Sequence, residues 1–115
     1  MATSGAPAPK ERRQFGRLRI GLQAELLIGG QSASIRVTTT DISLGGCYVE
    51  MMFTLPVGTP LQVVLWLDDA KVVGGAVVAT CDPQFGNGIR FVDMTWQDKV
   101  RLEKYLAEVA SRPAN

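Results

Sequence analysis

Residues 61–80 read LQVVLWLDDAKVVGGAVVAT, two apolar runs that flank a pair of aspartates. Both runs are rich in valine, whose branched side chain favours strands. Asp68 and Asp69 favour a turn, because aspartate side chains bond to nearby backbone groups. The stretch therefore predicts two strands, Leu61–Leu67 and Lys71–Thr80, joined by a tight turn.

Short apolar runs separated by turn residues continue on both sides of this stretch. Gly29 and Gly30 mark a turn, since glycine tolerates a positive φ. Proline and glycine within residues 56–60 and 81–87 predict two loops. Repeated short strands are typical of a small barrel or sandwich, and six of them allow partial closure. The four further strands are expected at Leu18–Ile28, Ser34–Thr40, Cys47–Phe53 and Gly88–Val92.

The C-terminal part of the chain has the spacing of an amphipathic helix. Its apolar stripe, at positions i, i+4 and i+7, consists of Leu102, Leu106 and Val109. Thr95, followed three residues later by Asp98, resembles a capping box, which marks the start of a helix. We therefore predict a helix over Trp96–Ala110 that packs its stripe on the strands, with Trp96 as an anchor.

A chain of 115 residues supports one domain. Residues 1–10 are mostly small and include two prolines, so we expect a disordered tail there. Residues 11–115 are expected to fold as a single unit, with the strands in 18–92 and the helix in 95–110. The side chains expected in its core include Trp66, Cys47 and Cys81.

The composition excludes several classes of protein. The chain has no histidine, so it lacks His-dependent catalytic triads and imidazole metal sites, and its two cysteines alone cannot complete a tetrahedral zinc site. We therefore expect no enzyme activity, no metal and no bound cofactor. No apolar run reaches the roughly 18 residues of a membrane span, and the N-terminus has no apolar leader. Two cysteines make no disulfide framework, which favours a cytoplasmic protein.

Positive charge is concentrated at the start of the chain. Residues 1–20 contain five basic and one acidic residue, a net charge of +4. The other 95 residues contain seven basic and ten acidic residues, a net charge of −3. This asymmetry indicates an anionic partner. The negative remainder opposes binding along DNA or RNA, because it repels their phosphates.

Three arginines, Arg12, Arg13 and Arg17, stand just before the first predicted strand. A guanidinium makes paired hydrogen bonds to phosphate or to the O6/N7 edge of guanine, and it stacks on flat rings. Residues 11–17 therefore suit an arm that clamps a phosphate or a nucleotide. A solvated basic lead-in is the alternative interpretation.

Residues 41–46, DISLGG, form a second polar segment between predicted strands. Aspartate accepts hydrogen bonds, serine both donates and accepts them, and glycine lets a ligand approach the backbone closely. A plain β-turn, in which the polar side chains bond to their own backbone, is the alternative. If both segments lie at one mouth of a barrel, they imply a small, planar, doubly anionic ligand.

The motif RRxxxR at residues 12–17, followed by DxSxxG at residues 41–46, resembles the two-part signature of PilZ domains. These domains are bacterial receptors for the second messenger cyclic di-GMP. The resemblance covers nearly the whole chain and includes GIRF at residues 88–91. It implies a mainly β fold, a six-stranded antiparallel β-barrel with a C-terminal α-helix, which agrees with the strand count above. Gly16 departs from the family, in which proline is frequent at this position.

The resemblance assigns ligand-binding roles to four polar residues. Arg13 and Arg17 match the paired arginines that grip the phosphates and the guanine Hoogsteen edges. Asp41 and Ser43 match the positions that contact guanine and the phosphate–ribose ring.

The resemblance also implies roles for three neighbouring residues. Gly46, with Gly45 beside it, matches the site where a side chain would collide with the ligand. Arg12 matches a position at which arginine accompanies binding of two stacked, intercalated ligand molecules. We add Arg90, on the last predicted strand, as a further candidate contact.

We therefore interpret the sequence as a single-domain cyclic di-GMP receptor. The arginine arm is expected to become ordered over the barrel mouth when ligand binds, and to change a surface that a separate effector protein recognises. A monomer is favoured. The alternatives are an adaptor on the same fold that needs no ligand, and a binder of single-stranded nucleic acid, which the net negative barrel opposes.

Overall fold

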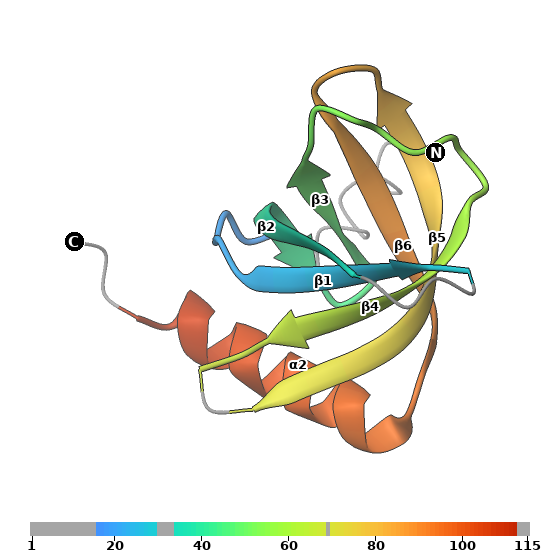
Figure 1. The fold of residues 1–115 in the computed structure, drawn as a ribbon. Helices are drawn as coiled ribbons and strands as arrows, with labels where there is room; N and C mark the ends of the chain where they lie inside the picture. Colours follow the sequence, from blue (N-terminus) through green and yellow to red (C-terminus); the bar gives the residue numbers. More distant parts are fainter. Residues whose placement is uncertain (1–15, 30–33, 69, 113–115) are drawn as a thin grey trace, which may run out of the picture.

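In the part of the chain that the structure describes, six antiparallel strands close into a barrel and one helix lies against its outside (Figure 1). This computed structural model describes residues 16–29, 34–68 and 70–112, so the tail predicted at residues 1–10 lies outside the described residues. The order around the barrel is β1-β2-β3-β6-β5-β4, so β1 pairs with both β2 and β4. The predicted barrel with a C-terminal helix is therefore confirmed. The elements are β1 (Gln23–Ile28), β2 (Ile35–Ser43), β3 (Gly46–Glu50), β4 (Pro60–Trp66), β5 (Lys71–Asp82), β6 (Gly86–Met94) and α2 (Trp96–Ala110).

Alternation along the strands builds the core of the barrel. In β4, Leu61, Val63 and Leu65 are buried, and the residues between them are more exposed. Trp66 follows Leu65 and therefore faces outward, with 42% of its surface exposed. Its predicted place in the core is wrong. The ring instead lies beside Lys71, whose Nζ is 5.3 Å from the ring centroid.

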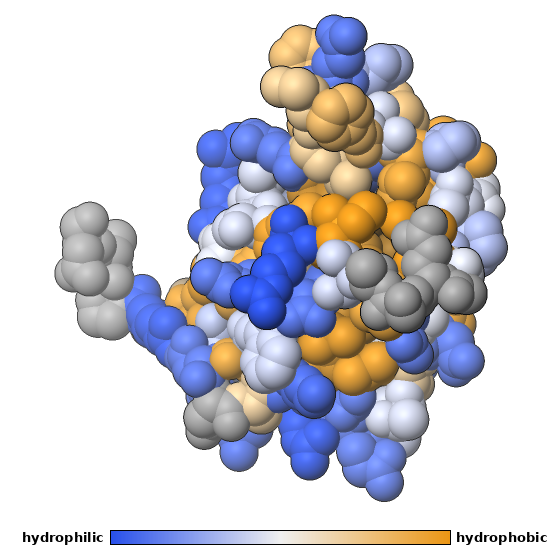
Figure 2. Space-filling model, viewed as in Figure 1, coloured by the Kyte–Doolittle hydropathy of each residue, from blue (hydrophilic) through white to orange (hydrophobic). Residues whose placement is uncertain are grey.

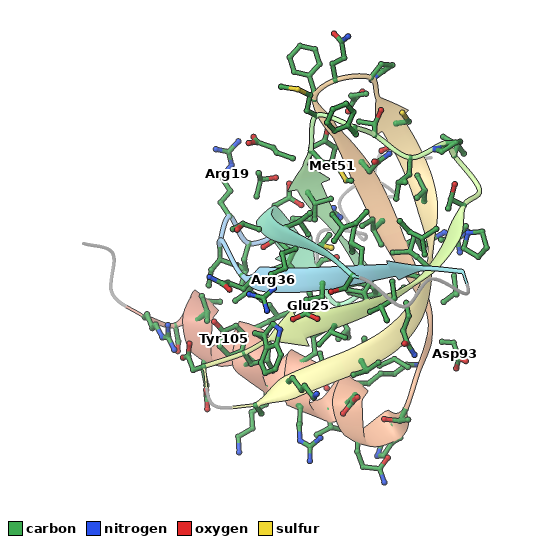
Figure 3. All side chains as sticks on the ribbon, viewed as in Figure 1. Arg19, Glu25, Arg36, Met51, Asp93 and Tyr105 are labelled. Carbon is green, nitrogen blue, oxygen red and sulfur yellow. The ribbon has the colours of Figure 1, made fainter. Side chains whose placement is uncertain are left out.

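Helix α2 has the predicted bounds and begins at the predicted cap. Thr95 Oγ1 accepts a hydrogen bond from the Asp98 N–H at 3.1 Å, and the Asp98 carboxylate accepts one from the Val73 N–H of β5 at 3.0 Å. Trp96 is 76% exposed, so its predicted role as an anchor is wrong. It lies about 120° around the helix from Leu102, away from the buried face. The residues that anchor α2 are Leu102, Tyr105 (Figure 3) and Leu106, with Val109 partly buried beside them.

The first strand is shorter than predicted at its N-terminal end. β1 begins at Gln23 rather than at Leu18, and the preceding residues lie beside β2 outside the regular ladder. Thr39 is buried in β2, and its Oγ1 accepts from the Leu22 N–H at 2.8 Å and donates to the Ile20 carbonyl at 2.7 Å. The Thr39 N–H also donates to the Leu22 carbonyl at 2.9 Å, so a side chain and one backbone bond together hold the segment here in place of a regular ladder.

The β2–β3 hairpin reaches further into residues 41–46 than predicted. β2 runs to Ser43 and β3 begins at Gly46, because the backbone of the polar segment pairs across the hairpin. β3 then ends at Glu50 and does not extend to the predicted end at Phe53.

The loop predicted at residues 81–87 is instead a tight turn between two long strands. β5 continues to Asp82 and β6 starts at Gly86, since Cys81 pairs with Asn87 and Asp82 with Gly86. The sixth strand is therefore nine residues long and not short. Cys81 is only partly buried, so its predicted burial is not confirmed.

Asn87 fastens the β3–β4 loop to the barrel. The side chain is fully buried, and its Nδ2 donates to the carbonyls of Leu55 at 2.8 Å and Thr80 at 3.1 Å. Its Oδ1 accepts from the Leu55 N–H at 2.8 Å. Both N–H donors and the oxygen of this buried amide are therefore bonded to backbone groups.

We expect Asn87→Ala to lower the free energy of unfolding by about 2–4 kcal/mol, because it leaves three backbone groups without their partner. Urea denaturation followed by circular dichroism measures this change. Gln62→Ala, on the exposed face of β4, is the control and should change stability by less than about 0.5 kcal/mol. Equal stability of the two variants would contradict the role given to Asn87.

Candidate functional site

The segment before β1 is held against the end of β2. Leu18 and Ile42 exchange two backbone hydrogen bonds, of 2.8 and 2.9 Å, and the Thr39 hydroxyl bonds further along the segment. These contacts fix the backbone on both sides of Arg19. They also place Arg17 beside Asp41, although the two residues are 24 positions apart in the sequence.

Arg17 and Asp41 form an ion pair at the surface. Both Nε and Nη2 of Arg17 lie 3.0 Å from Oδ1 of Asp41. The arginine side chain is 55% exposed, so part of its guanidinium remains available to an anion. The structure therefore brings together one residue from each predicted motif. Arg12 and Arg13 lie outside the described residues.

Ser43 and the two glycines that follow it make the β2–β3 turn. Ser43 is buried, and its Oγ accepts from the Gly45 N–H at 3.2 Å and donates to the Gly46 carbonyl at 3.4 Å. The Phe91 N–H of β6 donates to the Gly45 carbonyl at 2.9 Å. The Ser43 hydroxyl thus bonds to the backbone of its own turn, as the alternative interpretation of this segment expects. A ligand contact at Ser43 stays a prediction.

Gly45 and Gly46 differ in what surrounds them. A Cβ atom built on Gly46 would stand 2.2 Å from the Ile89 carbonyl oxygen and 3.2 Å from the Arg90 Cα. A Cβ on Gly45 would meet only the Ser43 Oγ, at 3.9 Å. The close approach of β3 and β6 therefore requires glycine at 46 without any ligand, whereas position 45 is open.

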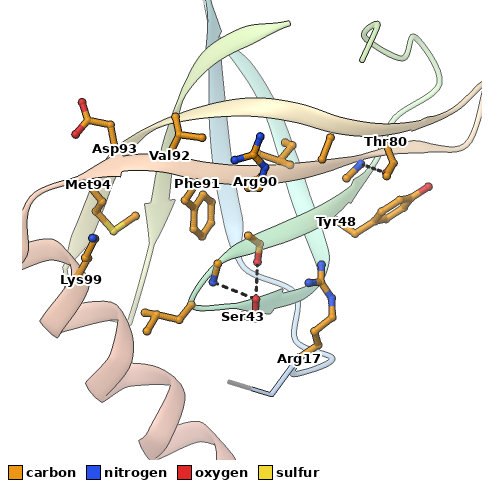
Figure 4. Close-up of a pocket in the computed structure, with 16 residues that line it drawn as sticks. Arg17, Ser43, Tyr48, Thr80, Arg90, Phe91, Val92, Asp93, Met94 and Lys99 are labelled. Carbon is orange, nitrogen blue, oxygen red and sulfur yellow. Dashed lines mark hydrogen bonds between the residues drawn. The ribbon is translucent and has the colours of Figure 1, made fainter. Parts of the chain in front are cut away.

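A groove of about 700 Å³ lies beside this turn, between the end of the β2–β3 hairpin, β6 and the start of α2 (Figure 4). Arg17, Gly45, Gly46 and Arg90 line it, and Arg90 lies opposite Gly46 in the β3–β6 register. The polar part of the lining also includes Ser43, Tyr48 and Thr80. The part nearer to α2 is more apolar and includes Leu44, Phe91, Val92 and Met94, with Asp93 and Lys99 at its edge.

Tyr48 is a groove residue that the sequence analysis missed. Its hydroxyl donates to Oδ2 of Asp82 at 2.6 Å, and this hydrogen bond raises the pKa of Tyr48 to about 12. The phenol is therefore neutral at pH 7 and presents a flat ring to the groove. Tyr48 stands two positions after Gly46 in a strand, so period-two alternation puts both on one face of the sheet. This spacing of two residues in the sequence could have predicted that Tyr48 lies on the same face as Gly46.

Cys47 precedes Tyr48 in β3, and its predicted burial is confirmed. Burial raises the pKa of the Cys47 thiol to about 12, with a smaller opposing effect of Arg17. The thiol is therefore protonated at neutral pH and is a poor nucleophile. Among the described residues, no three Cys, Asp or Glu side chains gather where they could hold a metal ion.

The groove thus combines two guanidiniums, a glycine-rich turn, a neutral phenol and an apolar wall. Guanidiniums bind phosphate, the glycines give access to backbone, and flat apolar walls pack against rings. This combination suits a nucleotide-like anion. The PilZ domain family model matches residues 11–108, which is most of the chain.

The chain belongs to the PilZ domain family. PilZ domains form a family of cyclic di-GMP receptors, and they are binding or adaptor domains rather than enzymes. Within the described residues, no helix has both the length and the apolar character needed to cross a bilayer.

Two solved structures share the fold of this PilZ domain. The inhibitor of motility MotI/DgrA from Bacillus subtilis has a TM-score of 0.71 and 21% sequence identity, over 89% of this chain and 54% of that protein. The PilZ domain of CeSA from a cellulose-synthesizing bacterium has a TM-score of 0.63 and 24% identity, over 79% of this chain and 97% of that domain. The chain thus spans about half the length of MotI/DgrA. No curated protein sequence matches the chain.

Proposed function

We propose that this PilZ domain binds cyclic di-GMP in the groove beside the β2–β3 turn. The observation that carries the proposal is the convergence of Arg17 and the turn residues at the groove, with Asp41 paired to Arg17 and Arg90 on the opposite strand. Arg17 and Arg90 supply positive charge for the two phosphates of the ligand. Asp41 accepts hydrogen bonds from a guanine edge, and Gly45 leaves the space for a close approach.

Arg13 and Arg12 complete the site from the N-terminal arm, residues 11–17. Arg13 stands four residues before Arg17, so roughly 14 Å of extended chain separates them at most. That reach keeps its guanidinium within range of the same ligand. Binding of the dianionic ligand offsets the repulsion between the arginines, and the arm becomes ordered over the groove. Arg12 holds a second, intercalated ligand molecule.

The output of this receptor is a change of surface that a separate effector protein recognises. The groove offers guanidiniums and a glycine-rich turn, which suit the binding of an anion, so we assign the chain a binding role and not a catalytic one. We assign the chain to the cytoplasm, as a monomer that binds neither DNA nor RNA.

Calorimetric titration of the purified chain with cyclic di-GMP tests the proposal. We expect saturable binding of cyclic di-GMP and none of GTP, with a ratio near two ligand molecules per chain. Arg12→Ala is expected to reduce the ratio toward one while binding persists. Absence of both heat and a thermal shift with cyclic di-GMP would contradict the receptor function and favour the ligand-independent adaptor. An unchanged ratio in Arg12→Ala would overturn only the role of Arg12.

A further inference from the structure

Three large apolar side chains are exposed at the end of the barrel remote from α2. They belong to Met52 and Phe53, after β3, and to Phe85, in the β5–β6 turn. Their exposed fractions are 71%, 85% and 73%. Figure 2 shows apolar atoms gathered at this end, at the top of the view, where Figure 1 places the β5–β6 hairpin. We call these three residues the apex.

The backbone that carries the apex is held in place. The Met51 N–H donates to the Phe85 carbonyl at 3.0 Å, which joins the two segments of the apex directly. The Phe85 N–H in turn donates to the Asp82 carbonyl at 2.9 Å. Met51, at the upper end of β3 in Figure 3, packs partly against the core, and Asn87 fixes the loop that follows. A partner therefore meets these side chains on a preformed frame, which lowers the entropy lost on binding.

The exposure of the apex has no explanation within the barrel. None of its side chains contributes to the buried core, and turns of this kind are built as well with polar residues. Adjacent exposed aromatic and methionine side chains on a fixed backbone are typical of a surface that a partner covers.

Two acidic side chains belong to the segments that build the apex. Glu50 ends β3, Asp82 ends β5, and both side chains are exposed and stand opposite Gly86. Residues 37–70 and 72–89 contain neither lysine nor arginine. The segments that build the apex therefore carry only negative charge at its rim.

We propose that the apex docks an amphipathic segment of a partner protein, in which apolar side chains are flanked by lysine or arginine. The apolar side chains cover Met52, Phe53 and Phe85, and the flanking cations pair with Glu50 and Asp82. A second copy of the chain would bring two acidic rims together, and an anionic membrane would repel the rim. The inference does not depend on ligand binding in the groove.

A synthetic helical peptide with a leucine stripe flanked by lysines tests this docking surface on the full chain. Binding is followed by amide chemical shifts and by fluorescence anisotropy. We expect the largest shifts at residues 52, 53 and 85, and weaker binding at higher salt. The double variant Phe53→Ser/Phe85→Ser is expected to bind the peptide at least about tenfold more weakly. Its fold should be unchanged, because both side chains are exposed.

Two controls separate docking from general stickiness. Trp96→Ser removes an equally exposed aromatic side chain from α2 and should leave peptide binding unchanged. A peptide with glutamates in place of the lysines should not bind. Equal binding of that acidic peptide, or full binding by the double variant, would overturn the proposal. So would self-association that the double variant abolishes, or apex-dependent binding to vesicles of anionic phospholipid.

Discussion

Arg17→Ala is expected to weaken cyclic di-GMP binding at least about 100-fold, equivalent to about 2.7 kcal/mol, while the barrel stays folded. Arg17 is the described arginine at which the two sequence motifs meet, through its contacts of 3.0 Å with Asp41. A guanidinium can make charge-assisted hydrogen bonds to a phosphate or a guanine edge, and alanine cannot replace them. The ion pair is solvent-exposed, so its loss should cost less than about 1 kcal/mol of stability.

The matched control is Arg101→Ala. Arg101 forms an ion pair of the same length with Asp98 on α2 and is equally exposed, at 57%, but it does not line the groove. The Arg101→Ala variant loses the same charge as Arg17→Ala, and its affinity for cyclic di-GMP should be unchanged. Arg17→Lys keeps the charge and removes the planar fork, so we expect an intermediate affinity. Arg13→Ala should behave as Arg17→Ala. Full binding of cyclic di-GMP by both Arg13→Ala and Arg17→Ala would show that these two arginines do not form the binding site.

The sequence alone was sufficient to predict the order of the strands along the chain and the bounds of the helix. Alternation in β4 and the spacing of Leu102 and Leu106 both reflect burial on one face, which leaves a periodic trace in the chain. The same alternation, applied strictly, places Trp66 outside. The start of β1 was not predictable, because the Thr39 hydroxyl takes the Leu22 N–H and the Ile20 carbonyl that a regular ladder would pair with backbone. Such a hydrogen bond depends on a neighbouring strand and leaves no periodic pattern in the sequence.

The candidate site was predictable only as two motifs. Their order implied that Arg17 and Asp41 could share a ligand, and the structure places them in contact. Tyr48 and Thr80 come from different strands, and their shared groove follows from the β3–β6–β5 register. Register depends on how a barrel closes, which a single sequence does not display.

Gly46→Ala is expected to destabilise the barrel by about 2–3 kcal/mol, because the new methyl group would overlap the backbone of β6. The Cβ would lie 2.2 Å from the Ile89 carbonyl oxygen, and a backbone atom in a paired strand cannot move aside as a flexible side chain can. For a domain of this size the melting temperature should fall by on the order of 10–20 °C. Thermal unfolding without ligand measures this loss of stability. Because the barrel is destabilised, we also expect Gly46→Ala to bind the ligand more weakly.

Gly45→Ala separates that effect from collision with the ligand. Its Cβ would have only the Ser43 Oγ nearby, at 3.9 Å, and Gly45 has no positive φ, so stability should change by less than about 0.5 kcal/mol. Because Gly45 lines the groove, the same methyl group should still weaken cyclic di-GMP binding. A stable Gly45→Ala variant with full affinity would place the ligand away from this residue. A stable Gly46→Ala variant would mean that β3 and β6 yield at this crossing, and that the glycine is required only by the ligand.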